Sequence, residues 1–93
     1  MARDELSHDV TRRSIRDAGL LGYHLTFAHG FRVVTVEGSE LGVLESLRYE
    51  RYAEFPDQIV VRRGRLRKRR FELGFELVES VDARARLVRV RDA

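Results

Sequence analysis

Residues 30–47 read Gly30-Phe-Arg-Val-Val-Thr-Val-Glu-Gly38-Ser-Glu-Leu-Gly42-Val-Leu-Glu-Ser-Leu47. Residues 31–36 are dense in the β-branched and aromatic side chains that favour strands, and residues 41–47 form a second apolar run. Between them, residues 37–40 supply the glycine and polar side chains of a turn. The stretch therefore predicts a β-hairpin. Leu44 and Leu47 stand three apart, off the two-residue period of a strand, so we expect a bulge between Gly42 and Ser46.

Short β-prone segments recur along the rest of the chain. We expect further strands over residues 23–27, 58–62, 71–77 and 87–90. Ile59, Val60 and Val61 make the strand at 58–62 too apolar for an exposed edge. Gly74 is a point where the strand at 71–77 could bend, and residues 78–81 break the alternation and predict a turn. Five or six strands without a long helical pattern between them predict an all-β fold, a small antiparallel barrel or sandwich.

The N-terminal segment has a different composition. It is polar and charged, and its apolar residues are sparse: Leu6, Val10, Ile15 and Leu20. Ser7 or Asp9 is suited to cap a short helix that ends near Gly19. We therefore expect an N-terminal arm over residues 1–21, either mobile or a short helix, and one domain over residues 22–91.

The hairpin resembles the opening of the PRC-barrel family, which has a glycine, paired valines, a glycine-bearing turn and a hydrophobic-Gly-x-hydrophobic-acid-x-hydrophobic run. The residues that carry the likeness are Gly30, Val33, Val34, Gly38, Leu41, Gly42, Leu44, Glu45 and Leu47. The likeness extends by pattern to about Val90, and departs at Leu73-Gly74, where the family commonly has a hydrophobic-Pro pair. It implies a PRC-type barrel that docks against proteins, as in the photosynthetic reaction centre H subunit and at the C-terminus of a ribosome maturation factor.

The charge of the chain is unevenly distributed. The net charge is +3, but seven cations fall within nine residues that contain no acid: Arg62, Arg63, Arg65, Arg67, Lys68, Arg69 and Arg70. The remainder of the chain carries 11 cations against 15 anions. Such a field steers association with acidic partners.

No motif for catalysis or cofactor binding stands out. The chain has no cysteine, and His8, His24 and His29 lack the spacing of a zinc site. The serines lack a Gly-x-Ser-x-Gly frame, and the glycines form no phosphate loop. We therefore expect a protein that is not an enzyme, without catalytic residues, metal or cofactor. No run resembles a signal peptide or the roughly 20 apolar residues of a membrane helix, so we expect a cytoplasmic protein.

Two functions suit these features, and the basic run also suits a merely solvated hairpin. The favoured hypothesis is an adaptor that docks a protein partner, with an acidic protein as one option, through the barrel exterior and the basic run. The alternative is RNA binding by the same run, with Tyr49, Tyr52 and Phe55 either stacking on bases or capping the barrel mouth. A homodimer is plausible through the apolar residues of the arm and the edge strands.

Overall fold

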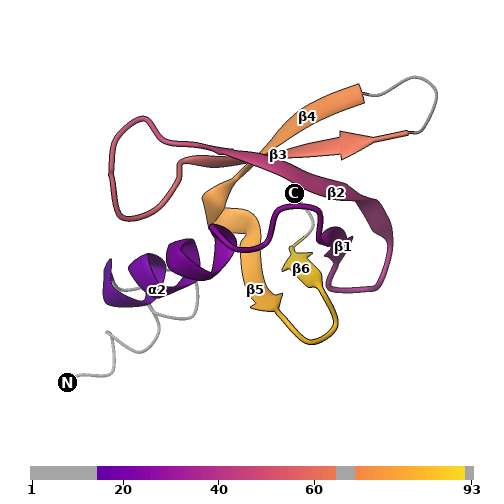
Figure 1. The fold of residues 1–93 in the computed structure, drawn as a ribbon, viewed down its shortest axis with the longest axis horizontal. Coiled ribbons are helices and arrows are strands. Elements are labelled where there is room, and N and C mark those ends of the chain that lie inside the picture. The colour runs from indigo at the N-terminus through magenta and orange to yellow at the C-terminus, as the bar shows by residue number, and fades with distance from the viewer. Residues whose placement is uncertain (1–14, 65–68, 92–93) are drawn as a thin grey trace.

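The computed structural model describes residues 15–64 and 69–91, which form one curved sheet and one short helix (Figure 1). The elements are α2 (Ile15–Leu25), β1 (Arg32–Thr35), β2 (Glu40–Arg48), β3 (Gln58–Arg63), β4 (Arg69–Gly74), the 3₁₀-helix η1 (Phe75–Leu77), β5 (Val78–Asp82) and β6 (Leu87–Val90). The fold is mostly β, as expected, with a short N-terminal helix. In the described residues, α2 is the only α-helix, and its 11 residues are too few to cross a membrane.

The six strands follow the order β4-β3-β2-β1-β6-β5. Neighbours pair antiparallel except β1 and β6, which run parallel, so the expectation of a fully antiparallel barrel is wrong at this pair. The reason is topological: β6 returns from the hairpin with β5 and enters the sheet beside β1 in the same direction. In the described residues no pairing joins β4 to β5, and the sheet keeps two open ends.

The predicted hairpin is β1 and β2, and β2 is irregular twice. Leu41 is an extra residue opposite β1, because Val33 pairs with Gly42 while Val34 pairs with Glu40. Glu45 is an extra residue opposite β3, where the register also shifts. The second irregularity confirms the bulge predicted between Gly42 and Ser46. These bulges bend β2, so that its first residues pair with β1 and its last residues pair with β3.

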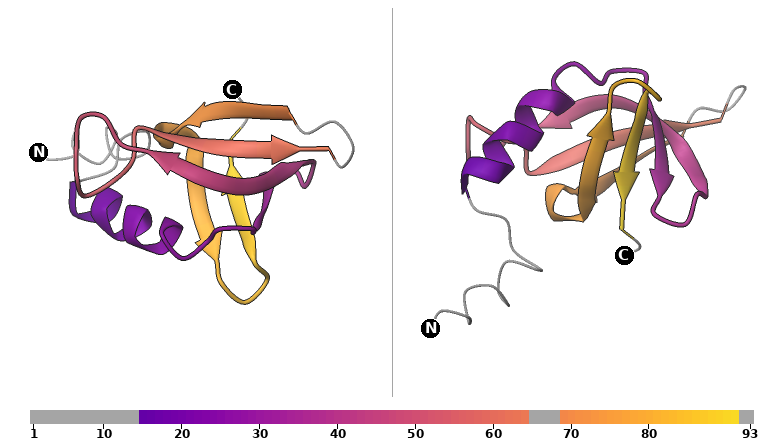
Figure 2. Two further views of the ribbon diagram at one scale, coloured as in Figure 1. Left: turned by 45° about the horizontal axis from the view of Figure 1, so that its top comes forward. Right: turned by 90° about the horizontal axis from the view of Figure 1, so that it is seen from below.

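The sheet folds over a single apolar core. Figure 2 shows β2, β3 and β4 crossing over β1, β6 and β5, with α2 against the open side. The most deeply buried core side chains are Leu25, Val33, Leu44, Ile59, Val61, Val78, Val88 and Val90. Val60 is also buried although it lies outside this core cluster, and β3 lies between β4 and β2, so the expectation that this strand is not an exposed edge is confirmed.

Three segments differ from their predicted conformation. Residues 23–27 do not form a strand: Tyr23 and Phe27 lie four apart on the exposed side, while Leu25 faces the core, and this is the spacing of a helix. The strand at 71–77 ends at Gly74 and continues as η1. Residues 78–81 are strand rather than turn, because a bulge at Glu79 against β6 interrupts the alternation.

The predicted N-terminal arm lies largely outside the described residues. Residues 1–14, with the proposed caps Ser7 and Asp9, are not among them, and α2 continues past Gly19 to Leu25. The expected boundary between residues 21 and 22 therefore falls within a helix.

The helix packs closely on the connector between β2 and β3. At Gly22, a Cβ atom would lie 2.8 Å from Cβ of Phe55 and 2.9 Å from the carbonyl oxygen of Glu54. At Gly19, one helical turn earlier, a Cβ would meet nothing within 4 Å. The two glycines of α2 therefore differ in function: Gly22 permits the contact, and Gly19 has no such role.

We predict opposite effects for two alanine substitutions in α2. Gly22→Ala should lower the free energy of unfolding by about 1–3 kcal/mol, because the methyl group overpacks the contact with Phe55. Gly19→Ala should raise it by about 0.5–1 kcal/mol through helix propensity alone. Urea denaturation of both variants measures the difference, and an equal change in the two would contradict this packing.

Candidate interaction surface

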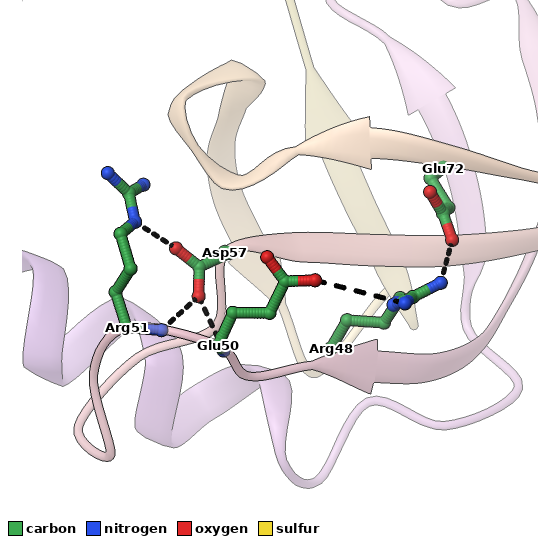
Figure 3. Close-up of polar contacts among 5 residues, drawn as sticks. All are labelled: Arg48, Glu50, Arg51, Asp57 and Glu72. Carbon is green, nitrogen blue, oxygen red and sulfur yellow. Dashed lines mark hydrogen bonds and ion pairs between the residues drawn. The ribbon is translucent and has the colours of Figure 1, made fainter.

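Two ion pairs cover the outer face of the sheet formed by β2, β3 and β4. Arg70 donates from Nε to Glu45 Oε1 at 2.5 Å and from a terminal nitrogen to Oε2 at 3.1 Å. Arg48 forms an ion pair with Glu72 (Figure 3). Each pair joins β2 to β4 across β3, the strand between them. On β3, Val60 pairs with Ser46 of β2 on one side and with Glu72 of β4 on the other. The hydrogen bond from Arg70 lowers the pKa of Glu45.

The predicted basic run divides into paired and unpaired arginines. Arg62 lies opposite Arg70, and Arg63 lies opposite Arg69, at the end of β3 and β4 remote from the connector. Of these four, only Arg70 forms an ion pair with a described residue. Arg65, Arg67 and Lys68 lie outside the described residues. We call Arg62, Arg63 and Arg69 the basic end.

Ion pairing is common on the described surface, although Arg84, Arg86 and Arg89 near β6 also have no carboxylate within 4 Å among the described residues. The basic end differs from them because its arginines lie opposite other arginines on neighbouring strands. Arg32, Arg48, Arg51 and Arg91 each lie within 4 Å of a carboxylate, as does Arg70. At the basic end, the Arg63 and Arg69 side chains are exposed and Arg62 is half-buried. A shallow hollow beside them is lined by Arg63, Gly64, Arg69, Arg70 and Phe71. Guanidinium groups and one aromatic ring thus share a surface.

The predicted aromatic residues lie at the opposite end of β3. Phe55 stacks on the buried Phe75 at a centroid distance of 5.2 Å, and Tyr52 lies 4.6 Å from Phe55. Tyr49 and Tyr52 are exposed by 43% and 45%. Because the six residues of β3 span about 20 Å, these rings are far from the basic end. Among residues 15–64 and 69–91, the rings and the cations of the predicted RNA site therefore lie apart.

Asp57 holds the connector in place, a role that the sequence reasoning missed. Its carboxylate accepts hydrogen bonds from the backbone N–H of Glu50 at 2.6 Å and of Arg51 at 2.8 Å, and from Nε of Arg51 at 2.6 Å (Figure 3). The side chain is only 7% exposed. These donors, with the backbone N–H of Arg51 first, lower the pKa of Asp57. The available signal was an acid directly after the only proline of a polar connector.

A second surface lies on α2 and the turn that follows it, and of its residues the sequence analysis singled out only Leu20 as an exposed apolar point. Leu20, Tyr23 and Phe27 are exposed by 58%, 59% and 67%, and the rings of Tyr23 and Phe27 meet edge to face at 5.1 Å. The strand predicted for residues 23–27 hid the spacing that brings these side chains together.

No arrangement suited to metal binding occurs in the part of the chain that the structure describes, where no three His, Cys, Asp or Glu residues cluster. His24 and His29 are exposed on the surface, and His8 lies outside the described residues. The described geometry therefore directs attention to surface contacts, and the expectation that the protein is not an enzyme stays a prediction.

We predict that Asp57 makes the free energy of unfolding depend on pH. A carboxyl whose pKa in the folded state lies below its ordinary value of 3.8 stabilises the fold fully above that value, and this contribution is lost as the pH falls through the lowered pKa. Asp57→Asn should therefore be less stable than the native chain near neutral pH, and the gap should narrow below about pH 4. Urea denaturation between about pH 7 and pH 2 measures it, with Glu37→Gln, an exposed turn residue, as the control for loss of a charge. A gap that stays constant with pH would contradict the role of Asp57.

Neither the comparison with protein-family models nor that with curated proteins finds a match to this chain. The arrangement of its residues is thus the basis for a proposal about its function.

Proposed function

We propose that this protein is a non-enzymatic adaptor that docks an acidic protein through its basic end. The observation that carries the proposal is that Arg62 and Arg63 lie directly opposite Arg70 and Arg69 on neighbouring strands, while Arg62, Arg63 and Arg69 have no carboxylate within 4 Å among the described residues. The guanidinium fork matches a carboxylate in bidentate geometry, and an acidic partner would supply the missing anions.

The position of the charges supports a role in binding rather than in stability. Arg63 and Arg69 lie directly opposite each other on neighbouring strands, and like charges in this position destabilise a sheet. Arg62 opposite Arg70 repeats the arrangement, although Glu45 neutralises Arg70. An anionic partner would relieve the remaining repulsion, so binding gains free energy that the free protein lacks.

We also propose that the sheet is an incomplete barrel of the PRC type. The positions of residues that carry the resemblance support this proposal: Val33 and Leu44 are buried in the core, and Gly38 takes a positive φ in the turn between β1 and β2. Gly42 lies against the backbone of β3, and Glu45 binds Arg70 across the sheet. This proposal makes docking of proteins, as in other members of that family, the favoured role.

RNA binding has less support. Stacking platforms strengthen single-stranded RNA binding when they line the same groove as the cations. Tyr49, Tyr52 and Phe55 are at the other end of β3, and Phe55 is occupied by Phe75. The basic end alone would give only weak, sequence-independent contacts with phosphates.

We predict that an acidic peptide binds the basic end. Fluorescence anisotropy with a labelled glutamate-rich peptide should show binding that weakens between about 50 mM and 200 mM salt. The double variant Arg63→Gln with Arg69→Gln should bind about fivefold more weakly, from roughly 0.5 kcal/mol for each exposed pair. The matched control is Arg84→Gln with Arg89→Gln, which removes the same charge from exposed residues near β6.

Two results would contradict the proposal. Equal losses in the two double variants would show that only net charge matters. A single-stranded RNA of equal charge that binds more tightly than the peptide, and loses affinity in the first double variant, would favour the RNA alternative instead.

A further inference from the structure

The two ends of the sheet are not equivalent. At one end, α2 lies against β5, as Figures 1 and 2 show. At the other end, no strand among residues 15–64 and 69–91 pairs with the outer edge of β4. A free edge presents a row of backbone N–H and C=O groups that can pair with another chain. Helix α2 lies beside β5, whereas the outer edge of β4 has no strand paired with it among the described residues and is available for pairing.

The side chains of β4 give this edge a definite chemistry. Phe71 and Leu73 are half-buried and pack against the core, so one face of the edge is apolar. Arg70 and Glu72 on the other face are already paired with Glu45 and Arg48 of β2. The unpaired charge is therefore concentrated at the start of the strand.

That start lies at the basic end. Arg69 begins β4, with Arg63 opposite it on β3, and the hollow beside them includes the ring of Phe71. From Arg69 toward Gly74, the side chains that a partner strand would contact along this edge are first cationic and then apolar. Because side chains alternate between the faces of a strand, one extended segment can meet both.

We propose that the β4 edge accepts an extended segment of the partner as a seventh strand, with an acidic end beside Arg63 and Arg69 and an apolar residue beside Phe71. This inference rests on the proposed function and names the mode of docking. Backbone hydrogen bonds along β4 give affinity, and the cations select an acidic partner and fix its direction. For antiparallel addition, the acidic end is the C-terminal end of the segment, since β4 begins at Arg69.

The test uses an eight-residue peptide with alternating valine and threonine in its first half and glutamates in its second half. Two further peptides carry N-methyl groups on its odd or on its even backbone amides, with unchanged charge. An added strand directs only one of these sets toward β4, so one methylated peptide should lose at least about tenfold in affinity while the other stays within about threefold. Amide exchange of residues 69–74 should slow with the unmodified peptide and not with the weak one.

The outcomes separate the inference from the function on which it rests. If all three peptides bind equally, and Arg63→Gln with Arg69→Gln weakens the binding of all three, docking depends on charge alone. Addition of a seventh strand is then excluded, while the proposed adaptor function is retained. If no peptide binds and the glutamate-rich peptide also fails, the proposed function falls with it. If slowed exchange at residues 69–74 depends on protein concentration without peptide, a second copy occupies the edge and the inference is overturned.

Discussion

The close passage of β2 over the end of β3 is the constraint on which the fold depends. Gly42 has a φ of +151°, and a Cβ atom there would collide with the carbonyl oxygen of Arg62 and lie 2.9 Å from the Val61 side chain. Glycine alone permits this approach. With the bulges at Leu41 and Glu45, it allows one strand to pair with β1 at one end and with β3 at the other. The sheet can then fold over its own core without breaking.

The same bend arranges the charges. Glu45 is the extra residue of a bulge, and from that position its half-buried side chain reaches Arg70 two strands away. Arg70 is thereby neutralised by Glu45, and Arg48 is paired separately with Glu72. The two pairs together cover Val60, an apolar residue on the outer face of β3. Beyond the bend, β2 offers no carboxylate that pairs with Arg62, Arg63 or Arg69 within the described residues. The bend in β2 therefore determines which arginines of β3 and β4 are paired with a carboxylate and which are not.

The sequence predicted those features that depend on local patterns. The β1–β2 hairpin, the bulge near Glu45, the connector and the last strand follow from side-chain periodicity and turn residues. A short N-terminal helix was expected to end near Gly19, and its continuation to Leu25 was missed because Tyr23, Leu25 and Phe27 alternate as in a strand. Burial in the core shows that Leu25 faces away from the other two. The Asp57 contacts and the pairing of Arg70 join residues 6 and 25 positions apart. The only local signal for the first was the acid after Pro56, and no local pattern indicated the second. The seven cations were found, but not which of them are neutralised.

The arrangement also explains why stability and binding need not compete in this small sheet. Asp57 and the stack of Phe55 on Phe75 secure one end of β3, next to the helix contact at Gly22. Repulsion between Arg63 and Arg69 acts at the other end, about 20 Å away, where few buried side chains depend on it. A strand held firmly at one end can carry unpaired like charges at the other, and those charges lie beside the open edge. Placing the charges in the middle of β3 would instead require burying them against Val60, at a much greater cost.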